Sequence, residues 1–247
     1  MKVKKNKKRK VWPFVLGIIG TLCIMAALAV TLCRTRAYVI EGNNYYSDNT
    51  IRTWIENDKL SFNTLAILAK YNMTEAELPA GVEQLHISLK NPWTVKVTVE
   101  EKEMAGYVTL DDAYLYFDGE GMVILRSKKL IEGVPFVEGL EYDAAKAAVG
   151  AVLPVEDSGI FGKIMDVSRN LRKYELVPDR LSCADGTIRL YFGVVEVLLG
   201  TGDYEQKLQQ VTPILEKLAE LYPETAGTLH LENYESVSDS IRFVPAS

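Results

Sequence analysis

An uncharged, mostly apolar stretch near the amino terminus constrains this chain more than any other feature. Seven of residues 2–10 are Lys or Arg, and no charged residue follows between Val11 and Cys33. Twenty-three residues at the helical rise make a helix of roughly 35 Å, long enough to cross the hydrocarbon core of a bilayer. Because the cations precede the stretch, the positive-inside rule predicts a cytoplasmic amino terminus. We predict 1–10 as a cytoplasmic basic tail and 11–33 as a transmembrane helix.

A cleaved signal peptide is the alternative interpretation of the same stretch. The apolar part of a signal peptide spans about 7–15 residues, which is shorter than the stretch here. Ala27-Leu28-Ala29 nevertheless resembles a small-residue cleavage site. Trp12 and Tyr38 lie near the two ends, where interfacial aromatic residues are expected. We favour a retained anchor, with the remaining residues outside the cytoplasm.

The composition of residues 34–247 argues against several classes of function. The chain has 28 basic and 33 acidic residues, and removing the seven amino-terminal cations leaves 21 against 33, a net charge of −12. Such an acidic region repels phosphate backbones, which argues against nucleic-acid binding. Cys183 is the single cysteine of this region, so it cannot form an internal disulfide. The two histidines, His86 and His230, lack metal-site spacing, so we predict no metal and no cofactor.

The residues that follow the stretch predict a strand-helix-helix-strand-strand order. Gly42-Asn43-Asn44 marks a turn, and the second helix is predicted to carry Leu65, Leu68 and Ala69. Alternating apolar residues from Trp93 to Val99 have the period-2 pattern of a half-buried strand. The predicted elements are a strand over 37–41, helices that begin after Ser47 or Asp48 and after Ser61 or Asn63, and strands over 82–89 and 93–99.

Beyond Glu103 the pattern changes to short strands with two further helices. Asp203 has the position of a helix N-cap, and Pro213 is predicted to kink or restart the helix that follows it. The predicted fold class is therefore a single transmembrane helix plus an α+β ectodomain, whose second part has a mostly antiparallel sheet. The predicted elements are strands over 108–110, 114–117, 122–125, 176–183, 188–192, 194–199, 227–234 and 240–244, and helices over 161–174 and from 203.

Several of these segments, in their order and spacing, resemble the FtsQ/DivIB family of bacterial cell-division proteins over nearly the whole chain. Met104, where the family commonly has Pro, and Pro213 depart from the pattern. The resembling segments are Val39-Ile40-Glu41-Gly42-Asn43 with Ser47 and Ile51, Leu78-Pro79, Asn91-Pro92, Val95 to Lys102, Tyr114 to Gly121, Val134 to Gly139, and Gly227 to Leu231.

The resemblance implies an architecture and a role. It implies a POTRA domain of β-α-α-β-β order over 34–103 and an FtsQ/DivIB-type β domain over 104–247 that ends in an edge strand at 240–244. The implied role is a non-enzymatic bitopic scaffold of the divisome at the septum. Its implied partners are FtsB/DivIC-like and FtsL-like bitopic proteins, with the partner segment added to the last strand.

The carboxyl-terminal strand is the predicted partner-binding site. A last strand can present unpaired N–H and C=O groups, which an incoming strand satisfies by β-augmentation. Aromatic residues and Arg dominate interface energies, so Tyr234 and Phe243 are candidate anchors and Arg242 a candidate partner for a carboxylate. The alternative is that Phe243 is core and Arg242 a solvated edge residue. The predicted site residues are Tyr234, Ser240, Ile241, Arg242, Phe243 and Val244.

Two other classes of function stay open at this point. A membrane-anchored cell-wall hydrolase or peptidase would need converging His, Glu or Ser groups, and the sequence has few His and no G-x-S-x-G motif. We therefore predict no catalytic residues. A secretion or sensor module that shares only the POTRA fold is the third possibility, since a fold does not fix a function.

Overall fold

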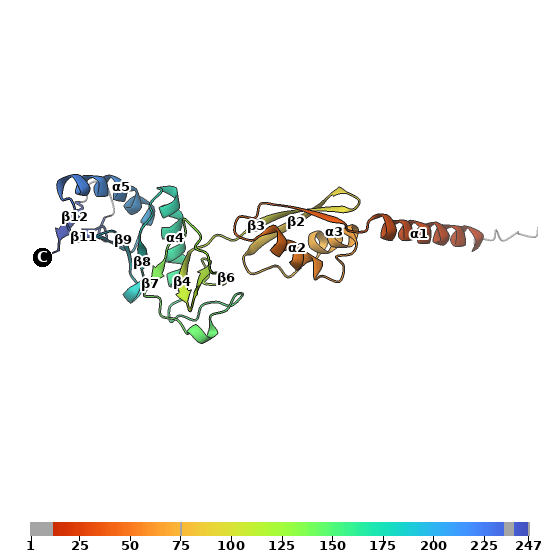
Figure 1. Cartoon of the computed structure of the whole chain (residues 1–247), viewed down its shortest axis with the longest axis horizontal. Coiled ribbons are helices and arrows are strands. Elements are labelled where there is room, and N and C mark those ends of the chain that lie inside the picture. Colours follow the sequence, from red (N-terminus) through yellow and green to blue (C-terminus); the bar gives the residue numbers. More distant parts are fainter. Residues whose placement is uncertain (1–11, 75, 235–239, 247) are drawn as a thin grey trace, which may run out of the picture. The chain divides into compact units, whose positions relative to one another are not determined.

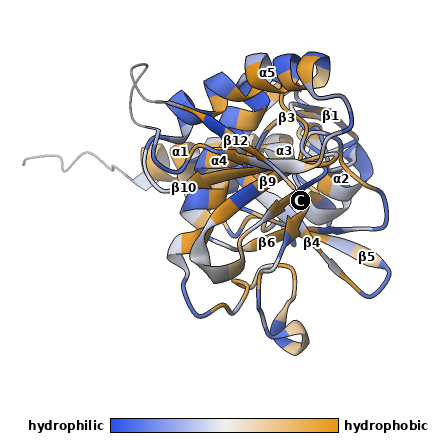
Figure 2. Ribbon diagram, turned by 90° about the vertical axis from the view of Figure 1, so that its left-hand side faces the viewer, coloured by the Kyte–Doolittle hydropathy of each residue, from blue (hydrophilic) through white to orange (hydrophobic). Residues whose placement is uncertain are grey.

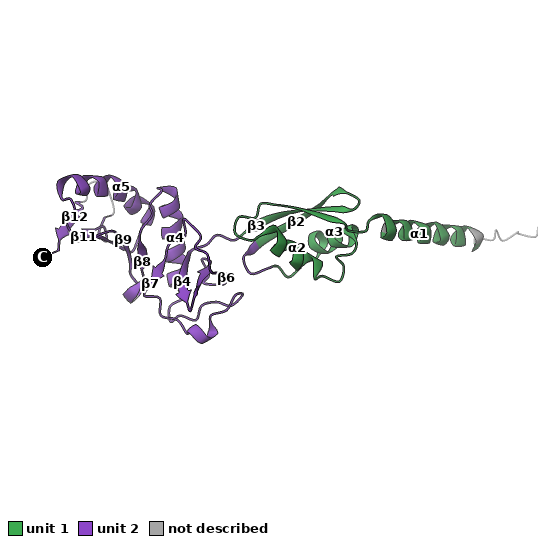
Figure 3. Ribbon diagram, in the orientation of Figure 1, with its two compact units in different colours: residues 1–78, 83–101 green, residues 79–82, 102–247 purple. Residues whose placement is uncertain are grey.

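The computed structural model describes residues 12–74, 76–234 and 240–246 of the chain, so the predicted basic tail lies outside the described residues. Figure 1 shows the helices and strands. The chain divides into two compact units, coloured separately in Figure 3. Unit 1 comprises residues 1–78 and 83–101, and unit 2 comprises residues 79–82 and 102–247.

The apolar stretch forms helix α1, Trp12–Leu32. Its segment Phe14–Leu32 has a mean hydropathy of 2.5 and is not packed inside the protein. This helix is long and apolar enough to cross a membrane, although a signal sequence can have the same length and composition. The prediction that the apolar stretch is helical is confirmed.

Unit 1 has the predicted order of elements after α1. Its three strands form a sheet of order β1-β3-β2, in which β1 runs parallel to β3 and Ala37 is opposite Thr94. The caps are among those that the sequence indicated, because the side chains of Ser47 and Asn63 accept hydrogen bonds from the first turns of α2 and α3. The elements are β1 Ala37–Glu41, α2 Asp48–Glu56, α3 Thr64–Met73, β2 Val82–Asn91 and β3 Thr94–Glu101.

Helix α3 carries Leu65, Leu68 and Ala69 as predicted, but its buried side is centred on other residues. Ile67 is buried, whereas Leu65 is 40% exposed and Ala69 is exposed. The Thr64 hydroxyl donates to the carbonyl oxygens of Cys33 and Pro92, at 3.1 and 2.7 Å, and so fixes which side of α3 faces inward. The buried apolar residues between α2 and β3 that unit 1 contributes are Ile51, Ile55, Ile67, Leu85, Ile87, Val95, Val97 and Val99.

Unit 2 contains two sheets. Strands β4, β5 and β6 form an antiparallel sheet, and the others form a six-stranded sheet of order β12-β11-β10-β9-β8-β7. The larger sheet is mixed, since β10 runs parallel to β11 and β7 parallel to β8, while its other pairs are antiparallel. The elements are β4 Gly106–Leu110, β5 Ala113–Phe117, β6 Val123–Ser127, β7 Val137–Glu138, α4 Gly159–Lys173, β8 Arg180–Ser182, β9 Ile188–Phe192, β10 Val195–Gly200, α5 Tyr204–Leu221, β11 Gly227–His230 and β12 Arg242–Pro245.

Helices α4 and α5 share one hydrophobic core with the strands of unit 2. Phe161 and Ile164 of α4, Leu208 of α5 and alternate strand residues such as Leu190 and Val197 are fully buried in it. Figure 2 shows hydrophobic and hydrophilic residues along the same α5 ribbon, as expected of a helix that is buried on one side.

Several predicted boundaries in unit 2 shift. The strand predicted over 176–183 is limited to β8, because the N–H of Leu176 donates to the carbonyl of Leu171 and closes α4 instead. The strand predicted over 227–234 ends at His230, and the one predicted over 240–244 runs two residues later than predicted at its start. The predicted restart at Pro213 does not occur, since α5 continues through this exposed proline.

Candidate protein-binding edge

Strand β12 lies at one edge of the six-stranded sheet. It pairs with β11 in antiparallel register, with Phe243 opposite Leu229 and Arg242 opposite His230. At the other edge, a bridge between Tyr107 and Phe136 extends the pairing towards β4. Within the described residues, no strand lies on the outer side of β12.

The register of β12 determines which backbone groups point outward. The N–H of Ala246 donates to the carbonyl of Ala226 at 2.7 Å, so this pair belongs to the hydrogen-bonded set of the ladder. Hydrogen-bonded pairs alternate with non-bonded pairs, which places Arg242 and Val244 in the same set as Ala246. Phe243, of the other set, therefore presents both its N–H and its C=O to the free edge. Pro245 presents a carbonyl alone, since proline has no N–H.

The side chain of Phe243 covers a glycine of the neighbouring strand. A Cβ atom at Gly227 would lie 2.4 Å from Cζ of Phe243, so this position needs a residue without a side chain. The ring centroid of Phe243 is also 6.2 Å from that of Tyr222, which follows α5. Phe243 is half-buried as a result, and it packs against the core of unit 2 while bordering solvent.

An apolar groove runs between α5 and β12. It has a volume of about 200 Å³, and Leu221 at its margin is 61% exposed. Leu221 was not among the predicted site residues, although it extends the apolar stripe of α5. The groove is lined by Ile214, Lys217, Leu218, Leu221, Leu229, Ile241 and Phe243.

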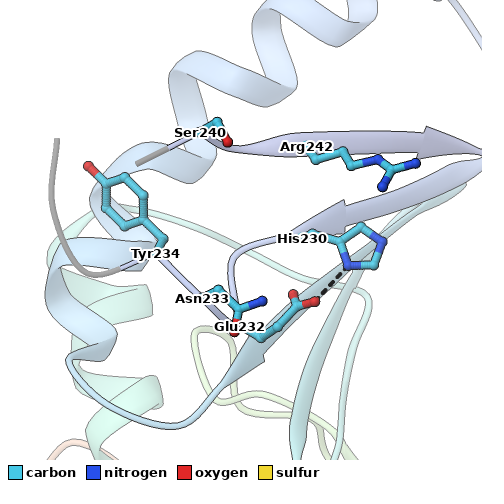
Figure 4. A pocket seen from close by; sticks show the side chains of 6 residues that line it. All are labelled: His230, Glu232, Asn233, Tyr234, Ser240 and Arg242. Carbon is cyan, nitrogen blue, oxygen red and sulfur yellow. Dashed lines mark hydrogen bonds and ion pairs between the residues drawn. The ribbon is translucent and has the colours of Figure 1, made fainter. Parts of the chain in front are cut away.

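The opposite face of the sheet is polar near β12. Arg242 is exposed and lies across from His230, whose Nδ1 is 2.7 Å from Oε1 of Glu232. Figure 4 shows these three side chains around a pocket of about 410 Å³. On β9, Tyr191 donates to Glu196 at 2.9 Å, and burial followed by this carboxylate raises the pKa of Tyr191. This face therefore carries paired charges, whereas the groove is apolar.

The predicted site residues do not all lie on the free edge. Tyr234 is 7% exposed and belongs to the core, so it is not an exposed aromatic anchor as it stands. Ser240 and Ile241 precede β12, and Ile241 lines the apolar groove. Arg242, Phe243 and Val244 lie on β12 itself, with Phe243 turned towards the groove and the other two towards the polar face. Phe243 therefore combines the two alternatives, because it packs against the core and also lies on the edge strand.

Chemistry-bearing groups are sparse in the described part of the chain. It contains no group of three or more His, Cys, Asp or Glu side chains that could hold a metal ion. Burial raises the pKa of the Cys183 thiol to about 11, which disfavours the reactive thiolate. His86 lies exposed in the middle of β2. The feature of unit 2 that is best suited to recognition is therefore the edge of β12 with its groove.

Fold and site together define a two-unit α+β protein with an amino-terminal membrane-type helix and a free strand edge near its carboxyl end. No protein-family model matches the chain. The chain is similar to the cell division protein DivIB of Clostridium botulinum strain Hall, with 23% identity over 228 residues, which cover 88% of this chain and 86% of that protein. This similarity confirms the resemblance to the FtsQ/DivIB family.

Proposed function

We propose that the chain is a membrane-anchored, non-enzymatic scaffold of bacterial cell division. The similarity to DivIB supports a division role, and the length and composition of α1 support a retained single-pass anchor. In this proposal residues 1–10 are cytoplasmic, 34–103 form a POTRA domain and 104–247 form the family's β domain. Both domains work outside the cytoplasm at the division septum.

The partners in this proposal are FtsB/DivIC-like and FtsL-like bitopic proteins. A segment of the first would add to the outer side of β12, where it would bond to the N–H and C=O of Phe243. Its alternate side chains would enter the groove between α5 and β12 or face Arg242 on the polar side. Backbone pairing supplies affinity in this mode of recognition, and the side-chain pockets supply specificity.

The free edge of β12 is the observation that carries this proposal. An unpaired strand edge is a hazard that proteins usually cover or blunt. Here the outward N–H and C=O groups lie beside an apolar groove with an exposed leucine, which an added strand would cover. A catalytic function has no comparable support from the described residues.

A pair of substitutions at one position tests strand addition directly. Phe243→Pro removes the outward N–H, and the edge of a sheet tolerates proline there because that N–H is not bonded to β11. Phe243→Ala removes the ring but keeps the N–H. We expect full-length Phe243→Pro to lose co-purification of a DivIC-like partner, and Phe243→Ala to retain part of it.

Three outcomes would contradict the proposal. Equal binding by Phe243→Pro, Phe243→Ala and the unaltered chain would place the interface elsewhere. Turnover of peptidoglycan by the purified protein would favour the hydrolase alternative instead. Circular dichroism of each variant checks that the sheet is intact, and a fluorescent fusion that spreads evenly over the membrane would contradict the septal role.

A further inference from the structure

The part of unit 1 that meets the end of α1 carries exposed large apolar side chains. Leu60, Phe62 and Leu65 are 43%, 55% and 40% exposed, and Trp93 is 45% exposed. They come from two distant segments, the start of α3 with the residues before it, and the turn between β2 and β3. We call these four residues the exit patch. Large apolar side chains that stay this exposed together indicate a surface that contacts something other than water.

Hydrogen bonds tie the exit patch to the residues that directly follow α1. The N–H of Thr35 donates to the carbonyl of Phe62 at 3.0 Å, and the N–H of Arg36 donates to that of Trp93 at 2.9 Å. The N–H of Thr64 donates to the carbonyl of Cys33 at 2.8 Å. Because α1 ends at Leu32, the exit patch begins within a few residues of the point where the chain would leave a bilayer. The position of the exit patch next to the end of α1 follows from these hydrogen bonds and does not depend on the direction of α1.

The charge around the exit patch is opposite to that of the rest of the region. Segments 33–37, 59–65 and 90–94 contain no Asp or Glu, although residues 34–247 as a whole carry a net charge of −12. The adjoining Asp58 accepts a hydrogen bond from the N–H of Leu60 at 3.1 Å, and its charge is paired with the ammonium of Lys70. The guanidinium of Arg36 lies 5.9 Å from the ring centroid of Trp93, within reach of a cation–π contact. The basic residues of the three segments are Arg34, Arg36, Lys59 and Lys90.

We propose that the exit patch inserts into the interfacial layer of the leaflet beside unit 1, and that its four flanking cations bind anionic phospholipid headgroups. Tryptophan and other bulky apolar residues favour this layer, and cations near it are attracted to anionic lipid. The inference rests on the retained anchor of the proposed function. A bilayer is the occupant that chain continuity supplies, since α1 brings the lipid surface to the exit patch.

Depth-dependent fluorescence quenching tests this inference on the full chain. The protein is placed in nanodiscs of phosphatidylcholine with or without phosphatidylglycerol, as Trp12→Phe/Trp54→Phe, in which Trp93 is the remaining tryptophan. The matched control is Trp12→Phe/Trp93→Phe, which keeps Trp54 of the same unit. We expect lipids spin-labelled near the headgroup to quench Trp93 about twofold more than Trp54, and phosphatidylglycerol to increase this difference.

Further variants separate the apolar from the electrostatic contribution. Phe62→Ser in the Trp93 background should reduce the quenching, whereas Val177→Ser, at an 80% exposed position in unit 2, should leave it unchanged. Arg34→Gln/Arg36→Gln should remove the response to phosphatidylglycerol. A Trp93 that stays more accessible to aqueous acrylamide than the half-buried Trp54 in every lipid would overturn the inference, and would favour a protein as the occupant.

Failure of the anchor is distinguishable from failure of the exit patch. Release of the chain from membranes by alkaline carbonate would contradict the retained anchor itself. Retention after carbonate together with unquenched Trp93 would contradict the exit patch alone. Equal quenching of Trp93 with and without phosphatidylglycerol would overturn the proposal that the cations bind anionic headgroups.

Discussion

Lys207 shows how a single residue holds the region next to β12. It is 2% exposed, and its ammonium donates to the carbonyl oxygens of Leu199, Thr201 and Glu232 at 2.8, 2.5 and 3.1 Å. These carbonyls come from the end of β10, the loop before α5 and the segment after β11. A buried ammonium needs such partners because its desolvation is costly.

We predict that Lys207→Met lowers the free energy of unfolding of unit 2 by about 2–4 kcal/mol, because three carbonyls lose a charged donor. Denaturant titration followed by circular dichroism measures the change. Lys217→Met is the matched control, since Lys217 is exposed on the same helix and should change stability little. Equal effects of both variants would show that the buried hydrogen bonds contribute nothing specific.

The thiol of Cys183 gives a prediction about pH. Burial raises its pKa from 9.0 to about 11, so the folded chain holds this proton more tightly than the unfolded chain. Its contribution to stability is therefore full below pH 9 and is lost as the pH rises towards 11. We expect Cys183 to resist iodoacetamide in the native protein at pH 8 and to react after denaturation, as peptide mass spectrometry would show. Fast native labelling would contradict the burial.

At the scale of elements, β2 and β12 are two sheet edges that differ. On β2 the side chain of Asn72 accepts from the N–H of Ile87 at 3.3 Å and donates to its carbonyl at 2.7 Å. The amide of Asn72 thereby bonds the outward-facing N–H and C=O of Ile87, as a neighbouring strand would. On β12 the described residues contain no such side chain beside Phe243, which agrees with its proposed role.

We predict that Asn72→Ala destabilises unit 1 by about 1–2 kcal/mol, since the backbone N–H and C=O of the buried Ile87 both lose their side-chain partner. Met73→Ala serves as control, because Met73 is 81% exposed on the next position of α3. Thermal unfolding of both variants measures the difference. If Asn72→Ala lost no more stability than Met73→Ala, the hydrogen bonds from the Asn72 amide to Ile87 would be replaced equally well by water.

Prediction from sequence succeeded where local chemistry decides the structure. The caps at Ser47, Asn63 and Asp203 follow from short polar side chains, and the order of elements in unit 1 follows from periodicity. It did not indicate which face of α3 is buried, because Thr64 is fixed by carbonyls from Cys33 and Pro92 that are distant in sequence. It also missed Leu221, since a groove depends on two elements meeting. The burial of Tyr234 could not be predicted either, because aromatic character alone does not indicate burial.

At the scale of the whole molecule, the two units have separate sets of buried residues. The core around Phe161 and Leu190 consists of residues between Ala105 and Phe243, all of which belong to unit 2. Ile51, Ile55 and Ile67 are buried in unit 1. Separate cores allow separate unfolding transitions.

We predict that Ile55→Ala lowers the stability of unit 1 by about 2–5 kcal/mol and leaves unit 2 unchanged, because the cavity forms in one core alone. The tryptophans, at positions 12, 54 and 93, all belong to unit 1, so their emission reports that unit. Far-ultraviolet circular dichroism reports both units. Ile164→Ala should have the reverse effect, and a shift of both transitions by either variant would contradict independent unfolding.

Pro245 at the end of β12 also bears on how copies of this protein behave when crowded in a membrane. If the β12 strands of two copies lay side by side, few hydrogen bonds would form between them, because Pro245 supplies no N–H donor. The two Arg242 side chains would add like charge to the same junction. Both features disfavour pairing of two copies through this edge.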